Sequence, residues 1–180
     1  MKKIFILLIL ISFHFTGRSQ EMGFNTTDVG GEFQWYPDGS ITSLHFAFNA
    51  KLHSSVNFRF GYNKTNRGDN GKHADEKGNG WGGSVGYRYY FKPFPYKFFI
   101  GSRLDLWKMK INWKDALVSG TSKTSTLQPT FEVGYTFIIN SQVFITPSFA
   151  NGFELNIKTD GQEVGHGLIT LLGISMGVRL

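Results

Sequence analysis

The stretch 65–80, reading TNRGDNGKHADEKGNG, holds the densest set of residues that could do chemistry. Its carboxylates, Asp69, Asp75 and Glu76, could offer oxygen ligands to a cation, but their spacing does not fit an EF-hand calcium loop. Arg67, Gly68 and Asp69 form the tripeptide that integrin-binding proteins expose. We predict a solvated surface loop with no metal ion and no other cofactor.

A second set of charged residues lies inside segments where apolar and polar residues alternate. By that alternation all six share the polar face, and three are acidic and three basic. They are Glu32, Arg59, Arg88, Arg103, Asp105 and Glu132. Buried charges persist only when they are paired. If this face is enclosed, we therefore predict a structural ion-pair network rather than a path for protons or ions.

Eight segments carry this alternation, which is the period of a β-strand. They are predicted at 25–36, 41–52, 55–64, 81–91, 96–111, 126–139, 142–157 and 165–180. In the last segment Leu172 and Ile174 alternate with Gly173 and Ser175, which gives one apolar face and one small or polar face. No segment after Gln20 has helical periodicity. The sequence therefore predicts an all-β domain over 20–180.

Two departures from regular strands are expected. The alternation changes phase after Leu106, where Trp107 and Met109 become the apolar residues, and a β-bulge could produce this change. Pro129 and Pro147 fall inside predicted strands, where proline removes a donor from the hydrogen-bond ladder. Local bulges are predicted at both prolines.

The N-terminal segment 1–19 has the features of a secretory signal peptide. Lys2 and Lys3 precede an apolar run, and small residues follow before Gln20. The run is shorter than the ~20 residues that a membrane-spanning helix needs. Without this segment the 19 basic residues fall to 16 against 13 acidic ones, so the exported domain is only weakly basic. It has no run of lysine or arginine suited to nucleic acid.

The connections between the predicted strands alternate between long and short. Long polar stretches at 65–80 and 112–125 lie on one side and short turns lie on the other, an asymmetry typical of outer-membrane barrels. All the tryptophans fall beside predicted outer loops, which predicts an aromatic girdle at the outer interface. These are Trp35, Trp81, Trp107 and Trp113. After Leu52, lysines are confined to loops, turns and nearby strand ends, which favours a narrow enclosed interior over a soluble carrier barrel.

On this strand count, loop asymmetry, signal peptide and terminal strand, the chain resembles the small eight-stranded outer-membrane β-barrels of Gram-negative bacteria. That class includes outer-membrane protein X and the membrane domain of outer-membrane protein A. The resemblance implies an antiparallel up-and-down transmembrane barrel in the outer membrane, surrounded by lipid and lipopolysaccharide. It also implies assembly through the C-terminal strand, although Leu180 stands where this class commonly ends in an aromatic residue.

We expect a monomeric, non-enzymatic barrel whose filled lumen supports a structural or surface-interaction role of loops 65–80 and 112–125. One alternative is a lipid A deacylase, which needs a histidine, a serine and an acid on the lipid-facing wall. Only His166 could face lipid there, and its serine would be Ser40 or Ser43, two strands away. The other alternative is a small pore.

Overall fold

The computed structural model describes residues 25–180, so the predicted signal peptide at 1–19 lies outside the described residues. Within that range, no helix is long and apolar enough to cross a bilayer. The strands are β1 (Thr26–Tyr36), β2 (Gly39–Lys51), β3 (Ser54–Asn66), β4 (Asp75–Tyr90), β5 (Lys97–Lys114), β6 (Ser119–Ile139), β7 (Val143–Phe153), β8 (Leu155–Asp160) and β9 (Leu168–Arg179). A short 3-10 helix, η1 (Gly68–Asn70), lies between β3 and β4.

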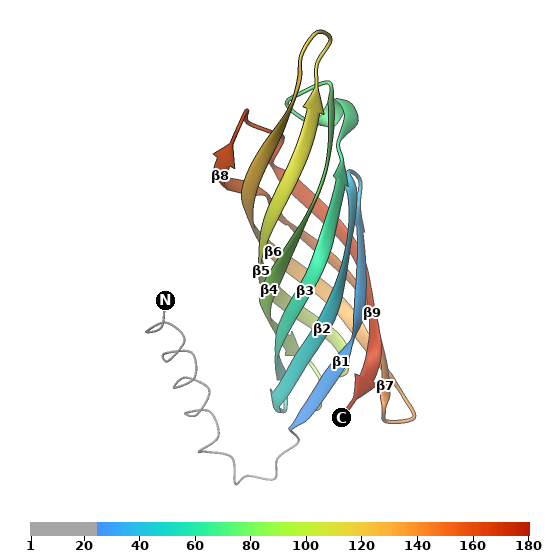
Figure 1. Ribbon diagram of the computed structural model, residues 1–180. Helices are drawn as coiled ribbons and strands as arrows, with labels where there is room; N and C mark the ends of the chain where they lie inside the picture. Colours follow the sequence, from blue (N-terminus) through green and yellow to red (C-terminus); the bar gives the residue numbers. More distant parts are fainter. Residues whose placement is uncertain (1–24) are drawn as a thin grey trace, which may run out of the picture.

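The strands form one closed antiparallel sheet (Figure 1). Each of β1 to β6 pairs with the next strand in the chain, and β9 closes the barrel by pairing with both β7 and β1. β7 and β8 both pair with β6 and are the two parts of one barrel strand, separated at Glu154. The prediction of an all-β, eight-stranded antiparallel barrel is therefore confirmed.

The two strand prolines do not produce the predicted bulges. Pro129 lies opposite Leu104 and Pro147 lies opposite Ile174, each within an unbroken register. The irregularity appears on the other neighbouring strand instead. The β7–β8 separation lies beside Pro129, and the β6–β7 ladder has no pairs between Gly134 and Phe137, beside Pro147. A proline has no N–H to donate, so the ladder is interrupted without an extra residue.

The two long outer connections are much shorter than predicted. β3 and β4 leave only 67–74 of the predicted loop 65–80, and β5 and β6 leave only 115–118 of 112–125. The glycines that suggested a loop are strand residues that face bulky side chains. Gly78 and Gly80 lie opposite Ile111 and Met109. Gly82, in the predicted strand, continues the pattern opposite Trp107, and a Cβ there would lie 2.4 Å from Cε3 of Trp107.

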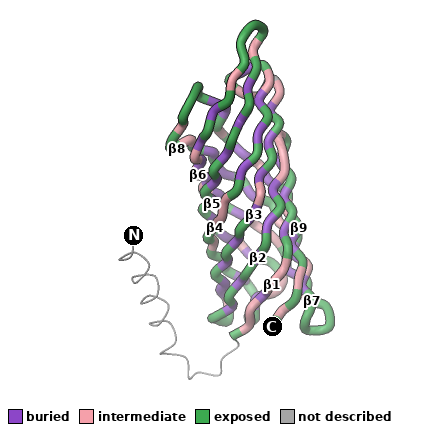
Figure 2. The backbone as a smooth tube through the Cα atoms, in the orientation of Figure 1, coloured by how far each residue is buried: buried purple, intermediate pink, exposed green. Residues whose placement is uncertain are grey.

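β5 also runs without the predicted bulge. Its burial alternates regularly from Phe99 to Trp113, so the same face points inward along the whole strand (Figure 2). The inward residues change instead, from Arg103 and Asp105 to Trp107 and later Trp113. The apparent change of phase in the sequence marks the level at which the lumen turns from polar to apolar.

Candidate functional site

The lower ion pairs of the lumen centre on Arg59 of β3. Its guanidinium lies 2.7 Å from a carboxylate oxygen of Glu32 and 2.5 Å from one of Asp105, and its Nε donates to the hydroxyl of Ser84 at 2.8 Å. Nδ1 of His45 is 3.3 Å from the other oxygen of Glu32. Both carboxylate side chains are at most 1% exposed. Arg59 thus links β1, β3 and β5 across the interior.

The network continues through Arg103 to the adjoining strand β6. Nε of Arg103 lies 2.9 Å from Asp105, and its Nη1 lies 3.1 Å from Glu132 on β6. Glu132 also accepts a hydrogen bond from Arg88, whose guanidinium stacks 4.5 Å from the ring centre of Phe99. The structure therefore brings all six of the charged residues singled out in the sequence into one connected group.

An apolar layer lies next to the ionic layer, toward the end where β4, β5 and β6 extend. It is built from Trp107, Ile111, Ile41 and Leu171, none more than 2% exposed, together with their buried neighbours. The indole N–H of Trp107 donates to Gln128 at 3.1 Å. The lumen is thus closed twice in succession, first by paired charges and then by packed hydrophobic side chains.

The outer mouth of the barrel is closed by a cluster around Glu76. This carboxylate is completely buried, faces the guanidinium of Arg67 at 3.5 Å, and accepts the backbone N–H of Gly165 at 2.9 Å. Arg67 also pairs with Glu154 at 2.8 Å, at the junction of β7 and β8. These contacts hold loops 67–74 and 161–167 against each other over the mouth, and they give Glu76 an architectural role instead of the cation-binding role considered from sequence.

His73 joins three outer connections. Its ring stacks on Trp113 with centres 4.3 Å apart, its Nδ1 lies 2.8 Å from a carboxylate oxygen of Asp115, and its Nε2 lies 3.1 Å from the carbonyl of Glu163. The hydrogen bonds from His73 and from the backbone N–H of Ala74 hold the pKa of Asp115 below its usual value. Both ring nitrogens of His73 thus face oxygen atoms of neighbouring connections, so the ring ties loop 67–74 to 115–118 and to 161–167.

The predicted tryptophan girdle is wrong for two of its four members. Trp35 and Trp81 point outward and are 51% and 58% exposed, and Trp81 packs against the rings of Phe60 and Tyr62. Trp107 and Trp113 point into the lumen and are 2% and 7% exposed. The error has one cause, because the predicted bulge in β5 would have turned these two side chains to the outside of the barrel.

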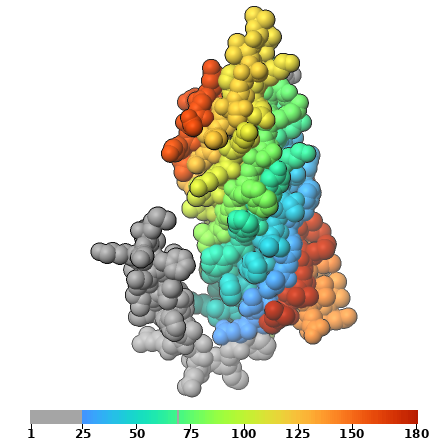
Figure 3. All heavy atoms as spheres, in the orientation of Figure 1, coloured from blue at the N-terminus to red at the C-terminus, as the bar shows by residue number. Residues whose placement is uncertain are grey.

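A belt of large apolar side chains covers the outside of the barrel below Trp35 and Trp81. Phe33, Leu44, Phe58 and Leu104 are typical members, each between 44% and 58% exposed. Seen from the face drawn in Figure 3, the β5–β6 hairpin rises beyond this belt as the tip of the molecule. An apolar surface of this extent marks contact with a membrane or another protein.

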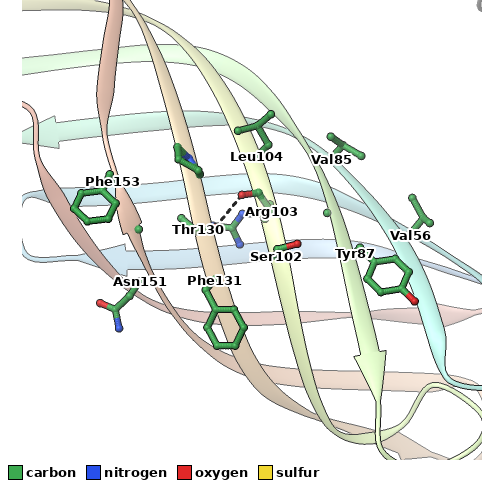
Figure 4. A pocket seen from close by; sticks show the side chains of 13 residues that line it. Val56, Val85, Tyr87, Ser102, Arg103, Leu104, Thr130, Phe131, Asn151 and Phe153 are labelled. Atoms are coloured by element: carbon green, nitrogen blue, oxygen red, sulfur yellow. Dashed lines mark hydrogen bonds between the residues drawn. The ribbon is translucent and has the colours of Figure 1, made fainter.

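A groove of about 630 Å³ crosses this belt on the outer wall (Figure 4). Val56, Leu104, Phe131 and Phe153 line it, whereas Arg103 beneath it turns into the lumen (Figure 4). The groove carries no charged group on its outer face and no histidine. It is a surface depression suited to apolar contacts.

No histidine, serine and acid come together on the outward-facing wall of the described barrel. Ser43 faces the lumen and is 5% exposed, while His166 is exposed in the loop before β9. His45 lies in the lumen and His53 bonds the carbonyl of Tyr90 at the opposite end. Residues 25–180 also contain no group of side chains that could hold a metal ion.

Comparisons with known proteins show the fold alone. No family model and no curated protein matches the sequence. The N-terminal barrel domain of Pseudomonas aeruginosa OprF is similar with a TM-score of 0.54 at 12% identity, over 88% of this chain and 100% of that one. Yersinia pestis Ail, solved with the heparin analogue sucrose octasulfate, gives a TM-score of 0.53 at 10% identity, over 89% of this chain and 100% of that one. The outer membrane protein AlkL gives a TM-score of 0.55 at 9% identity, over 91% of this chain and 92% of that one. The chain has the fold of the small outer-membrane β-barrels.

Proposed function

We propose that this protein spans the bacterial outer membrane as a sealed barrel and serves as a rigid, non-enzymatic support for the surface at its outer end. The exposed apolar belt supports the membrane location, because such a surface is stable only against lipid or another apolar partner. The shared fold with outer-membrane barrels supports the same location.

The observation that carries the proposal is the double closure of the lumen. An eight-stranded barrel is just wide enough to be filled by its own side chains. Here the ionic layer around Arg59 and the apolar layer around Trp107 fill it in succession, and the Glu76 cluster covers its outer mouth. This arrangement favours a support over a pore.

The surface that the barrel would present is stiff. β5 and β6 remain paired from Lys97 to Lys114, so the β5–β6 hairpin ends in a connection of only 115–118. Loops 67–74 and 161–167 are tied to it through His73 and Glu76. A partner at this end would therefore meet a preformed surface, which reduces the entropy lost on binding.

The experiment is reconstitution of the chain into lipid vesicles and planar bilayers. A folded barrel should insert, resist unfolding in SDS unless heated, and show no steady conductance. Steady single-channel steps from the inserted protein would contradict the sealed lumen and favour the pore. Failure to insert would contradict the membrane location.

A further inference from the structure

Four lysines project outward from the neighbouring strands β5, β6 and β8, just beyond the apolar belt. They are Lys108, Lys110, Lys123 and Lys158, and all are exposed. Within residues 25–180 the lysines that form ion pairs are Lys72 and Lys77, so none of these four has a carboxylate partner. Together they border a shallow groove of about 480 Å³.

The register of the strands places like charges side by side in this groove. Lys110 of β5 lies directly opposite Lys123 of β6. Like charges in directly opposed positions of an antiparallel pair are destabilising. Asp160 lies opposite Lys123 on β8 and is the one acidic residue in the groove, yet it makes no ion pair there. The groove therefore has a surplus of positive charge that the protein does not neutralise.

The residues beside this groove show its level along the barrel axis. Lys108 lies opposite the outward-facing Trp81 on β4. One step nearer the middle of the barrel on the same face, Leu106, Leu127 and Leu155 form a continuous apolar row across β5, β6 and β8. On β5 that step from Leu106 to Lys108 is about 7 Å, and the opposed pair Lys110 and Lys123 lies one further step out. The outer wall thus changes from leucine to lysine within the distance that separates lipid chains from lipid phosphates.

We propose that this lysine groove binds the phosphate groups of an outer-leaflet lipid that carries more than one phosphate. The inference rests on the proposed membrane location and adds a site to it. The ammonium groups of lysine act as point charges toward phosphate. The adjoining leucine row is placed to contact the acyl chains of the same lipid, which is why a lipid fits the groove better than a soluble polyanion.

The test uses the full exported chain in neutral phosphatidylcholine nanodiscs, titrated with lipid A that carries two phosphates or one. The Lys110→Gln/Lys123→Gln variant should bind the doubly phosphorylated lipid about thirtyfold more weakly than the parent chain, the expected loss of two lysine contacts near an anionic lipid surface. It should also lose the preference for two phosphates over one. The matched control, Lys51→Gln/Lys92→Gln, removes equal charge at the opposite end and should bind like the parent.

Three results would overturn the inference. The parent chain could bind both lipids equally, or the groove variant could bind like the parent. Soluble pyrophosphate or dextran sulfate could bind the lipid-free groove as tightly as the lipid, which would assign it to a soluble polyanion. Heat-dependent gel migration shows whether each variant is folded. In all three cases a chain that still inserts leaves the proposed membrane location standing, so the two proposals fail separately.

Discussion

Removing Arg59 is the sharpest perturbation of the ionic layer. Arg59→Ala deletes the contacts to Glu32 and Asp105 and the hydrogen bond to Ser84. Asp105 keeps Arg103 at 2.9 Å, but Glu32 keeps only the imidazole of His45 at 3.3 Å. Breaking a buried ion pair by deleting one partner typically costs about 3–5 kcal/mol. We expect a loss of unfolding free energy in that range, most of it from the stranded carboxylate of Glu32.

The assay is urea unfolding from lipid vesicles, followed by tryptophan fluorescence and by gel mobility. The control Lys64→Ala removes an exposed, outward-facing charge from the same strand, β3. It should change stability by less than about 0.5 kcal/mol. The compensated variant Glu32→Gln/Arg59→Met removes one charge of each sign. It should recover at least half of the loss, because a buried pair can be replaced by neutral side chains at little cost.

Two outcomes would refute this reasoning. If Arg59→Ala is as stable as the parent chain, the buried charges are not held by mutual pairing. If the compensated variant is less stable than Arg59→Ala alone, the loss does not come from the uncompensated charge of Glu32.

The remaining predictions concern the other layers of the lumen. Trp107→Ala should lower stability by about 3–5 kcal/mol yet leave the barrel non-conducting, whereas combining it with Arg59→Ala should produce a measurable leak in planar bilayers. Gly82→Ala should cost about 1–3 kcal/mol in urea unfolding because the new methyl group meets Trp107, while Gly31→Ala, whose nearest contact would be at 3.9 Å, should be close to neutral. The low pKa of Asp115 means that its bond to His73 contributes stability above the usual carboxyl value of 3.8 and loses it as the pH falls through the lower folded value. Amide exchange in 67–74 should therefore rise below that pH, and Asp115→Asn should abolish this dependence.

The strands and their inward faces could be predicted from sequence because alternation is a local signal. Segments such as 55–64 have a period of two residues throughout, and the structure places them within β3 with Arg59 inward. The same alternation placed all six network charges on one face, and barrel closure then brought them together. Their individual partners, such as Arg103 with both Asp105 and Glu132, depend on barrel register and could not be predicted from one strand.

The errors occurred where a residue type was interpreted without its partner on the next strand. Gly78 and Gly80 suggested a loop, and apolar residues at Trp107 and Met109 suggested a lipid-facing surface. Each interpretation is reasonable for one strand alone. Paired in register, the two observations explain each other, because the missing side chains of β4 make room for the large inward side chains of β5. The useful sequence signal is thus a pair of consecutive strands. The first has glycine at every second position, and the second has large apolar residues at the positions that pair with those glycines. Where that signal occurs in a narrow barrel, it predicts an internal apolar seal.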